Sequence, residues 1–195
     1  HGVEIKLADD GEILVKSPAV FKGYFKDEAA TNECIDEEGW LYTGDVGVFD
    51  GEFLKIVDRK KDIIITSGGK NVSPQEIENK IKISPFIKDA LVIGDKRKFL
   101  SVLIAIEFET VSNWALRKNI PHTTYRDLSE KKEVKDLVWS EILKANAETS
   151  SLEIRKFKMI PKELDHEDGE MTATQKIKRN VLMEKFSDLI EEMYS

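Results

Sequence analysis

The sequence is poor in the residue types that build disulfide frameworks and metal centres. Its 195 residues include one cysteine, Cys34, and three histidines, His1, His122 and His166. A single cysteine excludes a disulfide within the chain and favours a reducing compartment. The histidines lie far apart in loop-like contexts, so with Cys34 they form neither a metal-spaced set nor a catalytic triad. We therefore expect no metal site and assign these residues no catalytic role.

Long apolar runs and an excess of positive charge are also absent. No apolar stretch approaches the roughly 18 residues of a transmembrane helix, and the N-terminus carries no secretory signal. The formal net charge of -7 argues against general nucleic-acid binding, because neutralising phosphates usually needs a basic face. We expect a cytoplasmic globular protein that binds no nucleic acid. Since it opens with His1, we expect a piece of a longer protein.

The first 60 residues have the pattern of a β-rich segment. Apolar and polar residues alternate on both sides of ADDG (8–11), a typical hairpin turn, and Asp50-Gly51 is a second turn signal. Asp27 precedes a short helical run as its N-cap. The alternation predicts strands at 3–7, 12–16, 39–49 and 52–59. Residues 1–60 are therefore expected to be all-β with one small helix.

Helices and strands mix in the rest of the chain. Ser73, Pro74 and Glu76 form a capping box with proline at the first helical position, and Ile77, Ile81 and Ile83 supply that helix with an apolar stripe. The patterns predict further strands at 63–66, 89–95, 99–107 and 154–160, and helices at 109–119, 129–149 and 177–193. This half is expected to be an α+β domain around one small sheet.

Two motifs offer polar groups to a ligand, and each also has a purely structural interpretation. In LYTGD (41–45), Gly44 allows close approach and Asp45 can accept hydrogen bonds from a diol such as ribose. The structural alternative is a strand-end turn with a capping aspartate. In DRKKD (58–62), the planar guanidinium of Arg59 can bond a ribose or phosphate oxygen. The charged run is either a hinge between two domains or a solvated connection.

Two later segments also have both a functional and a structural interpretation when taken alone. SGGKN (67–71) has glycine backbone that can line a ligand channel, although a tight turn before a helix explains it as well. GEMTATQKIKRN (169–180) brings Lys176, Lys178 and Arg179 to the expected start of the last helix. Cations there cost about 0.3–1 kcal/mol, which is a modest hint of an anion-binding role, but the stretch by itself slightly favours a solvated helix start.

In this order the motifs resemble the C-terminal part of the adenylate-forming acyl-CoA synthetases. The resemblance runs through GYFKDEAAT, LYTGD, DRKKD, GGKNVSPQEIE and TATQKIKR. Many members of that family have a glycine directly before the terminal lysine, where this chain has Gln175. The form T-x-T-x-K-x-K-R and the long charged region at 109–150 are more similar to the long-chain fatty-acid–CoA ligases.

The resemblance implies a two-step ligase that uses ATP, Mg²⁺ and CoA. A fatty acid and MgATP give an acyl-adenylate and pyrophosphate, and CoA then attacks to give acyl-CoA and AMP. In this family a large N-terminal domain makes most of the contacts with ATP and Mg²⁺. Residues 1–60 resemble the β-rich end of that domain and residues 61–195 the mobile C-terminal lid, with a hinge at about 58–62. That large domain is then this chain's partner, and we expect the chain to be inactive alone.

The resemblance also implies a role for each matching residue. Lys176 is the implied catalytic residue of adenylation, where a fixed ammonium stabilises developing negative charge. No metal ligand is implied. Asp45 and Arg59 are the implied nucleotide-binding residues. Lys61 and Asp62 are the implied hinge residues, and the implied pantetheine channel is lined by Gly68, Gly69 and Lys70.

Two other functions remain open at this point. One is an adenylating enzyme that loads an acyl group onto a carrier protein, and the other is a non-catalytic binding module of the same fold. The joint presence of Asp45, Arg59, Lys61 and Lys176 favours a working enzyme. Peripheral membrane contact also stays open, because fatty-acid substrates favour it but no strongly basic amphipathic helix stands out.

Overall fold

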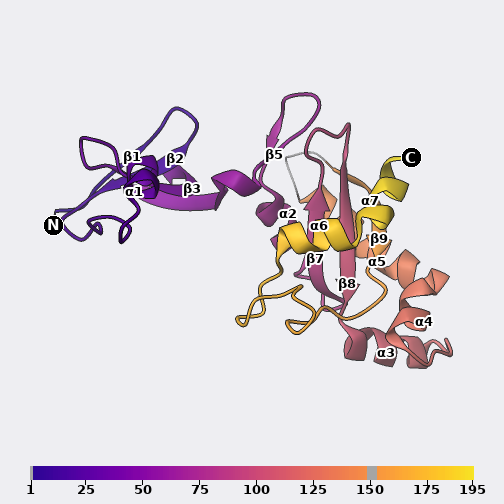
Figure 1. Cartoon of the computed structure of the whole chain (residues 1–195). Helices are drawn as coiled ribbons and strands as arrows, with labels where there is room; N and C mark the ends of the chain where they lie inside the picture. Colours follow the sequence, from indigo (N-terminus) through magenta and orange to yellow (C-terminus); the bar gives the residue numbers. More distant parts are fainter. Residues whose placement is uncertain (1, 149–152) are drawn as a thin grey trace. The chain divides into compact units, whose positions relative to one another are not determined.

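The computed structural model describes residues 2–148 and 153–195. They divide into two compact units, unit 1 (His1–Ile63) and unit 2 (Ile64–Ser195). Unit 1 is built mainly from strands, and unit 2 mixes helices and strands (Figure 1). The predicted α+β fold class is therefore confirmed.

Unit 1 is a four-stranded antiparallel sheet with the strand order β1-β2-β3-β4. Both predicted turns form, with Gly11 at φ +84° and Gly51 at φ +61°, conformations that glycine adopts without strain. Asp27 caps the short helix as predicted, because its carboxylate accepts a hydrogen bond from the Ala30 N–H at 3.0 Å. The elements are β1 (Glu4–Leu7), β2 (Glu12–Lys16), α1 (Glu28–Cys34), β3 (Leu41–Asp50), β4 (Phe53–Arg59) and the 3₁₀ turn η1 (Lys60–Asp62).

Unit 2 is organised around a three-stranded sheet, in which β8 pairs with β7 antiparallel and with β9 parallel. A separate two-stranded hairpin, β5-β6, precedes the first helix. The elements are β5 (Ile64–Ile65), β6 (Asn71–Val72), α2 (Pro74–Ile81), β7 (Ile87–Ile93), β8 (Leu100–Ile106), α3 (Phe108–Arg117), α4 (Tyr125–Glu130), α5 (Lys132–Ala147), β9 (Ile154–Met159), α6 (Arg179–Lys185) and α7 (Ser187–Tyr194).

Helices cover both faces of the three-stranded sheet. Alternate residues of β8 enter two separate apolar clusters, because successive side chains of a strand point to opposite faces. Val102 and Ile104 pack with α2, α3, α4 and α5, whereas Leu103 and Ala105 pack with α6 and α7. In Figure 1 the yellow α6 and α7 lie across β7 and β8. The segment that carries Lys176 thus leads directly into the helical layer over one face of the sheet.

Four details differ from the predictions. The helix predicted at 129–149 is two helices, because Lys131 is extended (φ -61°, ψ 135°) and Thr124 caps a separate α4 through the Asp127 N–H. The last helix begins at Arg179 rather than 177 and is interrupted at Phe186, where ψ is 25°. Ile83 is 75% exposed, so it lies outside the apolar stripe of α2. The short strand β6 was not predicted.

No helix among the described residues combines the length and the apolar character needed to cross a membrane.

Candidate functional site

Asp45 and Arg59 form the first candidate pair, on the neighbouring strands β3 and β4 of unit 1. They are direct partners in the antiparallel register, and Arg59 Nε lies 2.9 Å from Asp45 Oδ1. The Arg59 side chain is 58% exposed and that of Asp45 is 29% exposed. The pairing leaves both groups at a surface, where a carboxylate and a guanidinium together match the hydroxyls and phosphate of a nucleotide.

The local geometry corrects one sequence interpretation of Asp45. Strand β3 continues to Asp50, so Asp45 lies inside the strand and does not cap a strand-end turn. The ladder is irregular just beyond it, between Val46 and Gly47. Gly44, at φ +70°, donates its N–H to Glu12 Oε1 at 2.8 Å. Since Asp45 and Arg59 are paired in the register, the strand pairing itself places the Asp45 carboxylate next to Arg59 rather than in a turn.

Glu12 and Lys60 support this pair, although the sequence predicted a role for neither. The Glu12 carboxylate is buried and accepts from Gly44 N–H through one oxygen and from Lys60 Nζ, at 2.7 Å, through the other. Lys60 also contacts Asp10 at 2.6 Å. The hydrogen bonds that Lys60 donates to Asp10, and then to Glu12, raise the pKa of Lys60, and the bond from Lys60 lowers the pKa of Asp10. Glu12 therefore ties the TGD segment to the DRKKD segment, although its position in an alternating strand gave no signal of this.

Lys61 and Asp62, the predicted hinge residues, belong to η1 at the end of unit 1. Lys61 is exposed and Asp62 is half-buried. The turn is closed by the Ile63 N–H, which donates to Arg59 O at 3.2 Å. The boundary between the two compact units follows at Ile63–Ile64. A single 3₁₀ turn without a buried residue is a segment that can absorb a backbone rotation.

Gly68, Gly69 and Lys70 form the exposed apex of the β5-β6 hairpin in unit 2. Gly69 has φ +74°, and a Cβ built there meets no atom within 4 Å. Thr66 closes the apex with two backbone hydrogen bonds. Its N–H donates to Lys70 O at 3.1 Å, and its carbonyl oxygen accepts from the Gly69 N–H at 2.8 Å. Glycine is thus needed at 69 for its backbone conformation, and Gly68 leaves an open surface for a ligand.

The hairpin base is attached to the turn between β7 and β8. Lys96 N–H donates to Ile65 O at 2.8 Å, and Ser67 N–H donates to Arg97 O at 3.0 Å. Asp95 accepts from the Ile65 N–H at 3.1 Å. These bonds hold the glycine apex on the rigid sheet, which suits a loop that must meet a ligand in a fixed place.

Lys176 lies on a second, tighter hairpin of unit 2, Met171–Ile177, which we call the lysine hairpin. An isolated bridge joins Met171 and Ile177, and Thr172 N–H donates to Lys176 O at 2.8 Å. Lys176 is exposed, and within residues 2–148 and 153–195 no ion pair or hydrogen bond engages its ammonium group. Gln175 has φ +58°, the left-handed conformation that glycine adopts most easily. The lysine therefore projects from a turn before α6 and not from the helix itself.

The two neighbouring cations differ from Lys176. Lys178 is the exposed N-cap residue of α6 and its side chain makes no capping bond. Arg179 donates to Glu78 Oε1 from both Nη1 and Nη2, at 2.7 and 2.6 Å. Glu78 Oε1 also accepts from the Val92 N–H at 2.7 Å. Arg179 thus anchors α6 on α2 and β7, whereas Lys176 and Lys178 are both exposed.

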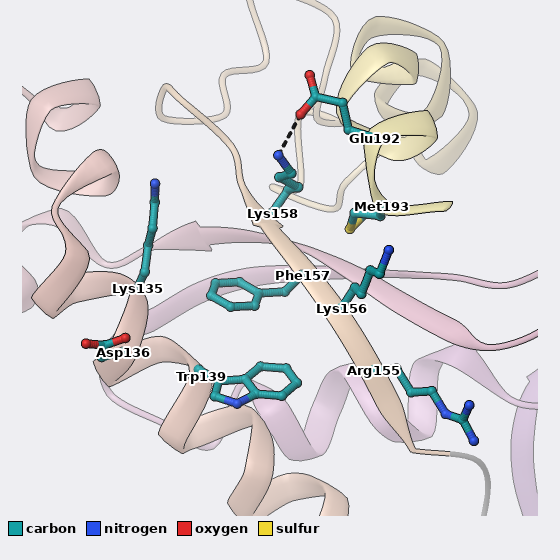
Figure 2. Close-up of a pocket in the computed structure, with 9 residues that line it drawn as sticks. All are labelled: Lys135, Asp136, Trp139, Arg155, Lys156, Phe157, Lys158, Glu192 and Met193. Atoms are coloured by element: carbon teal, nitrogen blue, oxygen red, sulfur yellow. Dashed lines mark hydrogen bonds and ion pairs between the residues drawn. The ribbon is translucent and has the colours of Figure 1, made fainter. Parts of the chain in front are cut away.

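A hollow of about 360 Å³ lies elsewhere on unit 2, among α5, β9 and α7. Figure 2 shows Trp139 and Phe157 at its floor, with rings 5.5 Å apart and an interplanar angle of 11°. Lys158 and Glu192 form an ion pair of 2.6 Å at its rim. The hollow contains none of the predicted site residues. Among the described residues, no group of three or more His, Cys, Asp or Glu is placed to hold a metal ion.

Comparisons with known proteins agree with the motif order. A family model described as the AMP-binding enzyme C-terminal domain matches residues 61–195. The long-chain-fatty-acid–CoA ligase FadD15 of Mycobacterium tuberculosis is 39% identical over 197 aligned positions, which cover 100% of this chain and 33% of that protein. The mouse long-chain-fatty-acid–CoA ligase 6 is 40% identical over 95% of this chain and 27% of its own length. The chain thus spans about a third of the length of these relatives.

Solved structures agree in fold. One is the A domain of the carboxylic acid reductase from Segniliparus rugosus, in complex with AMP and a co-purified carboxylic acid. The superposition covers 99% of this chain and 32% of the reductase chain, with a TM-score of 0.82 and 23% identity. The o-succinylbenzoate coenzyme A synthetase of Bacillus subtilis, in complex with AMP, covers 93% of this chain and 33% of that chain, with a TM-score of 0.61 and 28% identity. Because the family model covers well over half of its residues, this chain belongs to the AMP-binding enzymes and contains their C-terminal domain.

Proposed function

We propose that this chain is the C-terminal part of a long-chain fatty-acid–CoA ligase. The whole enzyme would convert a fatty acid, ATP and CoA into acyl-CoA, AMP and pyrophosphate. Identity of 39% along the full chain with a relative of that name supports the proposal. The observation that carries it is the exposed Lys176, held by its own hairpin at a position that matches the family's terminal lysine.

In the first step, a fatty-acid carboxylate oxygen attacks the α-phosphorus of ATP, and pyrophosphate leaves with the electron pair of the broken P–O bond. Both reactants are anions, so negative charge accumulates where the new bond forms. The Lys176 ammonium is free to contact these oxygens and stabilise that charge. One well-placed donor of this kind is worth about 10²–10³-fold in rate. Lys176 therefore needs no acid–base function.

In the second step, the CoA thiol attacks the acyl carbonyl, loses its proton and displaces AMP. We assign the surface that receives the pantetheine arm to the glycine apex, Gly68–Lys70. Its open backbone fits a narrow channel, because no side chain obstructs Gly68 or Gly69. Since Lys176 and the glycine apex serve different steps of one reaction, a rotation of the lid between the steps lets each act in turn.

The remaining assignments concern the nucleotide and the hinge. Asp45 would accept hydrogen bonds from the ribose hydroxyls, with Arg59 assisting, and the rotation would occur around Lys61–Asp62. We place residues 1–60 at the end of the large adenylation domain and residues 61–195 in the mobile lid. Mg²⁺ and most ATP contacts are assigned to the part of the protein outside this chain. Acyl-CoA formation by the purified 195-residue chain alone would contradict this division of labour.

The test uses the full-length protein and measures the two half-reactions separately. Lys176→Ala should lower acyl-adenylate formation by about 10²–10³-fold, because it removes one stabilising donor. Thioester formation from supplied acyl-adenylate should stay within about threefold of the unmodified enzyme. Lys178→Ala is the matched control, since that side chain is also exposed and two residues away. An unchanged adenylation rate in Lys176→Ala would reject the assignment. Offering a carrier protein in place of CoA separates the two enzyme functions.

A further inference from the structure

The lysine hairpin is too small to hold Lys176 in place by itself. Its strands meet at one bridge, Met171–Ile177, and its turn is closed by Thr172, which accepts from the N–H groups of Gln175 and Lys176. Residues 173–176 are exposed. A two-stranded hairpin of this length is marginally stable in water, so its geometry depends on what fixes its base.

Glu170, directly before the hairpin, closes that base through its backbone. Its carbonyl oxygen accepts from the Lys178 N–H at 2.8 Å, on the other side of the hairpin. Its own N–H donates to Asp165 O at 3.2 Å. Glu170 therefore joins the two ends of the lysine hairpin to each other and to the preceding loop.

The side chain of Glu170 is a completely buried carboxylate, 0% exposed. Lys185 Nζ, on α6, lies 2.6 Å from Oε1, and Lys162 Nζ lies 3.1 Å from each oxygen. The Asp165 N–H donates to Oε2 at 3.0 Å. Both oxygens are thus bonded, and the carboxylate joins the loop before the hairpin to the helix after it.

The charges around Glu170 are balanced. Burial raises the pKa of this carboxyl, but hydrogen bonds from Lys185, from the Asp165 N–H and from Lys162 outweigh burial, so the pKa lies below its usual value. Asp168, which is 52% exposed, forms ion pairs with the same two lysines. A charged, fully bonded carboxylate tolerates little displacement, because moving it would leave a buried charge unpaired.

We propose that Glu170 is a positioning residue for Lys176, whose buried carboxylate fixes the base of the lysine hairpin and thereby the place of the ammonium group during adenylation. The proposal rests on the proposed function, because it assumes that Lys176 acts in that step. A displacement of about 1 Å at a reacting group can cost about 10²-fold in rate. Loosening the hairpin should therefore affect adenylation far more than thioester formation.

The experiment uses Glu170→Gln in the full-length enzyme. Gln keeps the size of the side chain, but it replaces one acceptor oxygen with an NH₂ group. In the place of Oε1 this group faces the ammonium groups of Lys185 and Lys162, and in the place of Oε2 it faces Lys162 and the Asp165 N–H. Adenylation should fall by about 10–100-fold, and thioester formation from supplied acyl-adenylate should stay within about threefold, which also shows that the variant is folded. Asp168→Asn is the matched control, with the same two lysines as partners but at the surface, and should change adenylation by less than about threefold.

A double variant separates positioning from a general structural role. In the Lys176→Ala background, Glu170→Gln should lower adenylation by less than about twofold more, since the residue acts through the missing ammonium. Equal loss in both half-reactions, a further large loss in the double variant, or no effect of Glu170→Gln would each overturn the proposal. If Lys176→Ala itself keeps full adenylation, the proposed function fails instead. The two failures are therefore distinguishable.

Discussion

The ion pair between Arg179 and Glu78 should be a main support of unit 2. Arg179 is only 18% exposed and Glu78 12%, and both guanidinium Nη atoms lie within 2.7 Å of the same carboxylate oxygen. Arg179 also donates to Val92 O at 3.2 Å. The pair therefore holds the start of α6 against α2 and β7, so removing the arginine should destabilise the whole unit.

The magnitude follows from the burial of the pair. Breaking a buried ion pair by removing one partner costs about 3–5 kcal/mol, because the other charge loses its compensation. Both side chains here keep some contact with solvent, so we expect Arg179→Ala to lower the free energy of unfolding by about 2–3 kcal/mol. At roughly 3 °C per kcal/mol for a unit of this size, the melting temperature should fall by about 6–9 °C.

Urea unfolding followed by tryptophan fluorescence measures this effect. Two of the three tryptophans, Trp114 and Trp139, lie in unit 2 and pack against its core. Lys132→Ala is the control: it breaks the exposed pair with Asp136, at 3.7 Å and 88% and 68% exposed, and should cost less than about 0.5 kcal/mol. Adding Glu78→Gln to Arg179→Ala should recover part of the loss, since it removes the carboxylate charge that Arg179 compensated. A loss in Arg179→Ala as small as in the control would refute this reasoning.

Three further predictions concern the two hairpins. Gly68→Ala should change the melting temperature by less than about 2 °C, because φ is not positive at Gly68 and an added Cβ meets only Thr66 Oγ1, at 3.9 Å. A fall in thioester formation from supplied acyl-adenylate would therefore come from a lost contact with the ligand and not from lost stability. Gln175→Gly should keep adenylation and stability nearly unchanged, whereas Gln175→Val should cost about 1–2 kcal/mol in thermal unfolding, since a β-branched residue fits φ +58° poorly. The pKa of Glu170 is lowered on folding, so its stabilising effect is complete above the unfolded-state value of 4.5 and is lost as pH falls through the folded value. An acid titration of Glu170→Gln should therefore show a smaller loss of stability below about pH 4.5 than the unmodified protein, and an identical loss would contradict this.

Local patterns predicted the elements whose signals lie within a few residues of each other. The Ser73-Pro74 start of α2, the Asp27 cap and the Asp50-Gly51 turn all formed, because each depends on bonds that span two to four residues. The interruption at Lys131 was not predicted, because a continuous charged run there is equally compatible with one helix or two. Tertiary packing decides the outcome: α4 and α5 place Leu128 and Val134 in the same apolar cluster.

The predicted site residues came from the order of the motifs rather than from local physics. TGD, DRKKD, SGGKN and the final lysine segment each had a structural interpretation of equal or greater weight when taken alone. Their assigned roles remain predictions until the half-reactions are measured. The structure adds the supports that the motifs do not contain, since Glu12 bonds Lys60 and Gly44 across 48 and 32 positions of the chain. Contacts at such separations leave no periodic or spacing signal in one sequence.

The same limit explains why Lys176 could be predicted as a site residue from its motif while its structural support could not. Glu170 lies within the segment that resembles the family's lysine motif, yet the residues that bind its carboxylate, Lys162, Asp165 and Lys185, are spread over both sides of it. In the sequence these are two ordinary lysines, in a chain that is 34% charged, and one backbone N–H. Burial makes them specific: a carboxylate with 0% exposure must find partners, whereas the exposed Asp168 beside it need not. Lys176 pairs with Thr172 directly after the hairpin turn, so its place depends on a hairpin base that cannot move. The buried Glu170 supplies that base, so substitutions at 170 and 176 should act as one unit in adenylation.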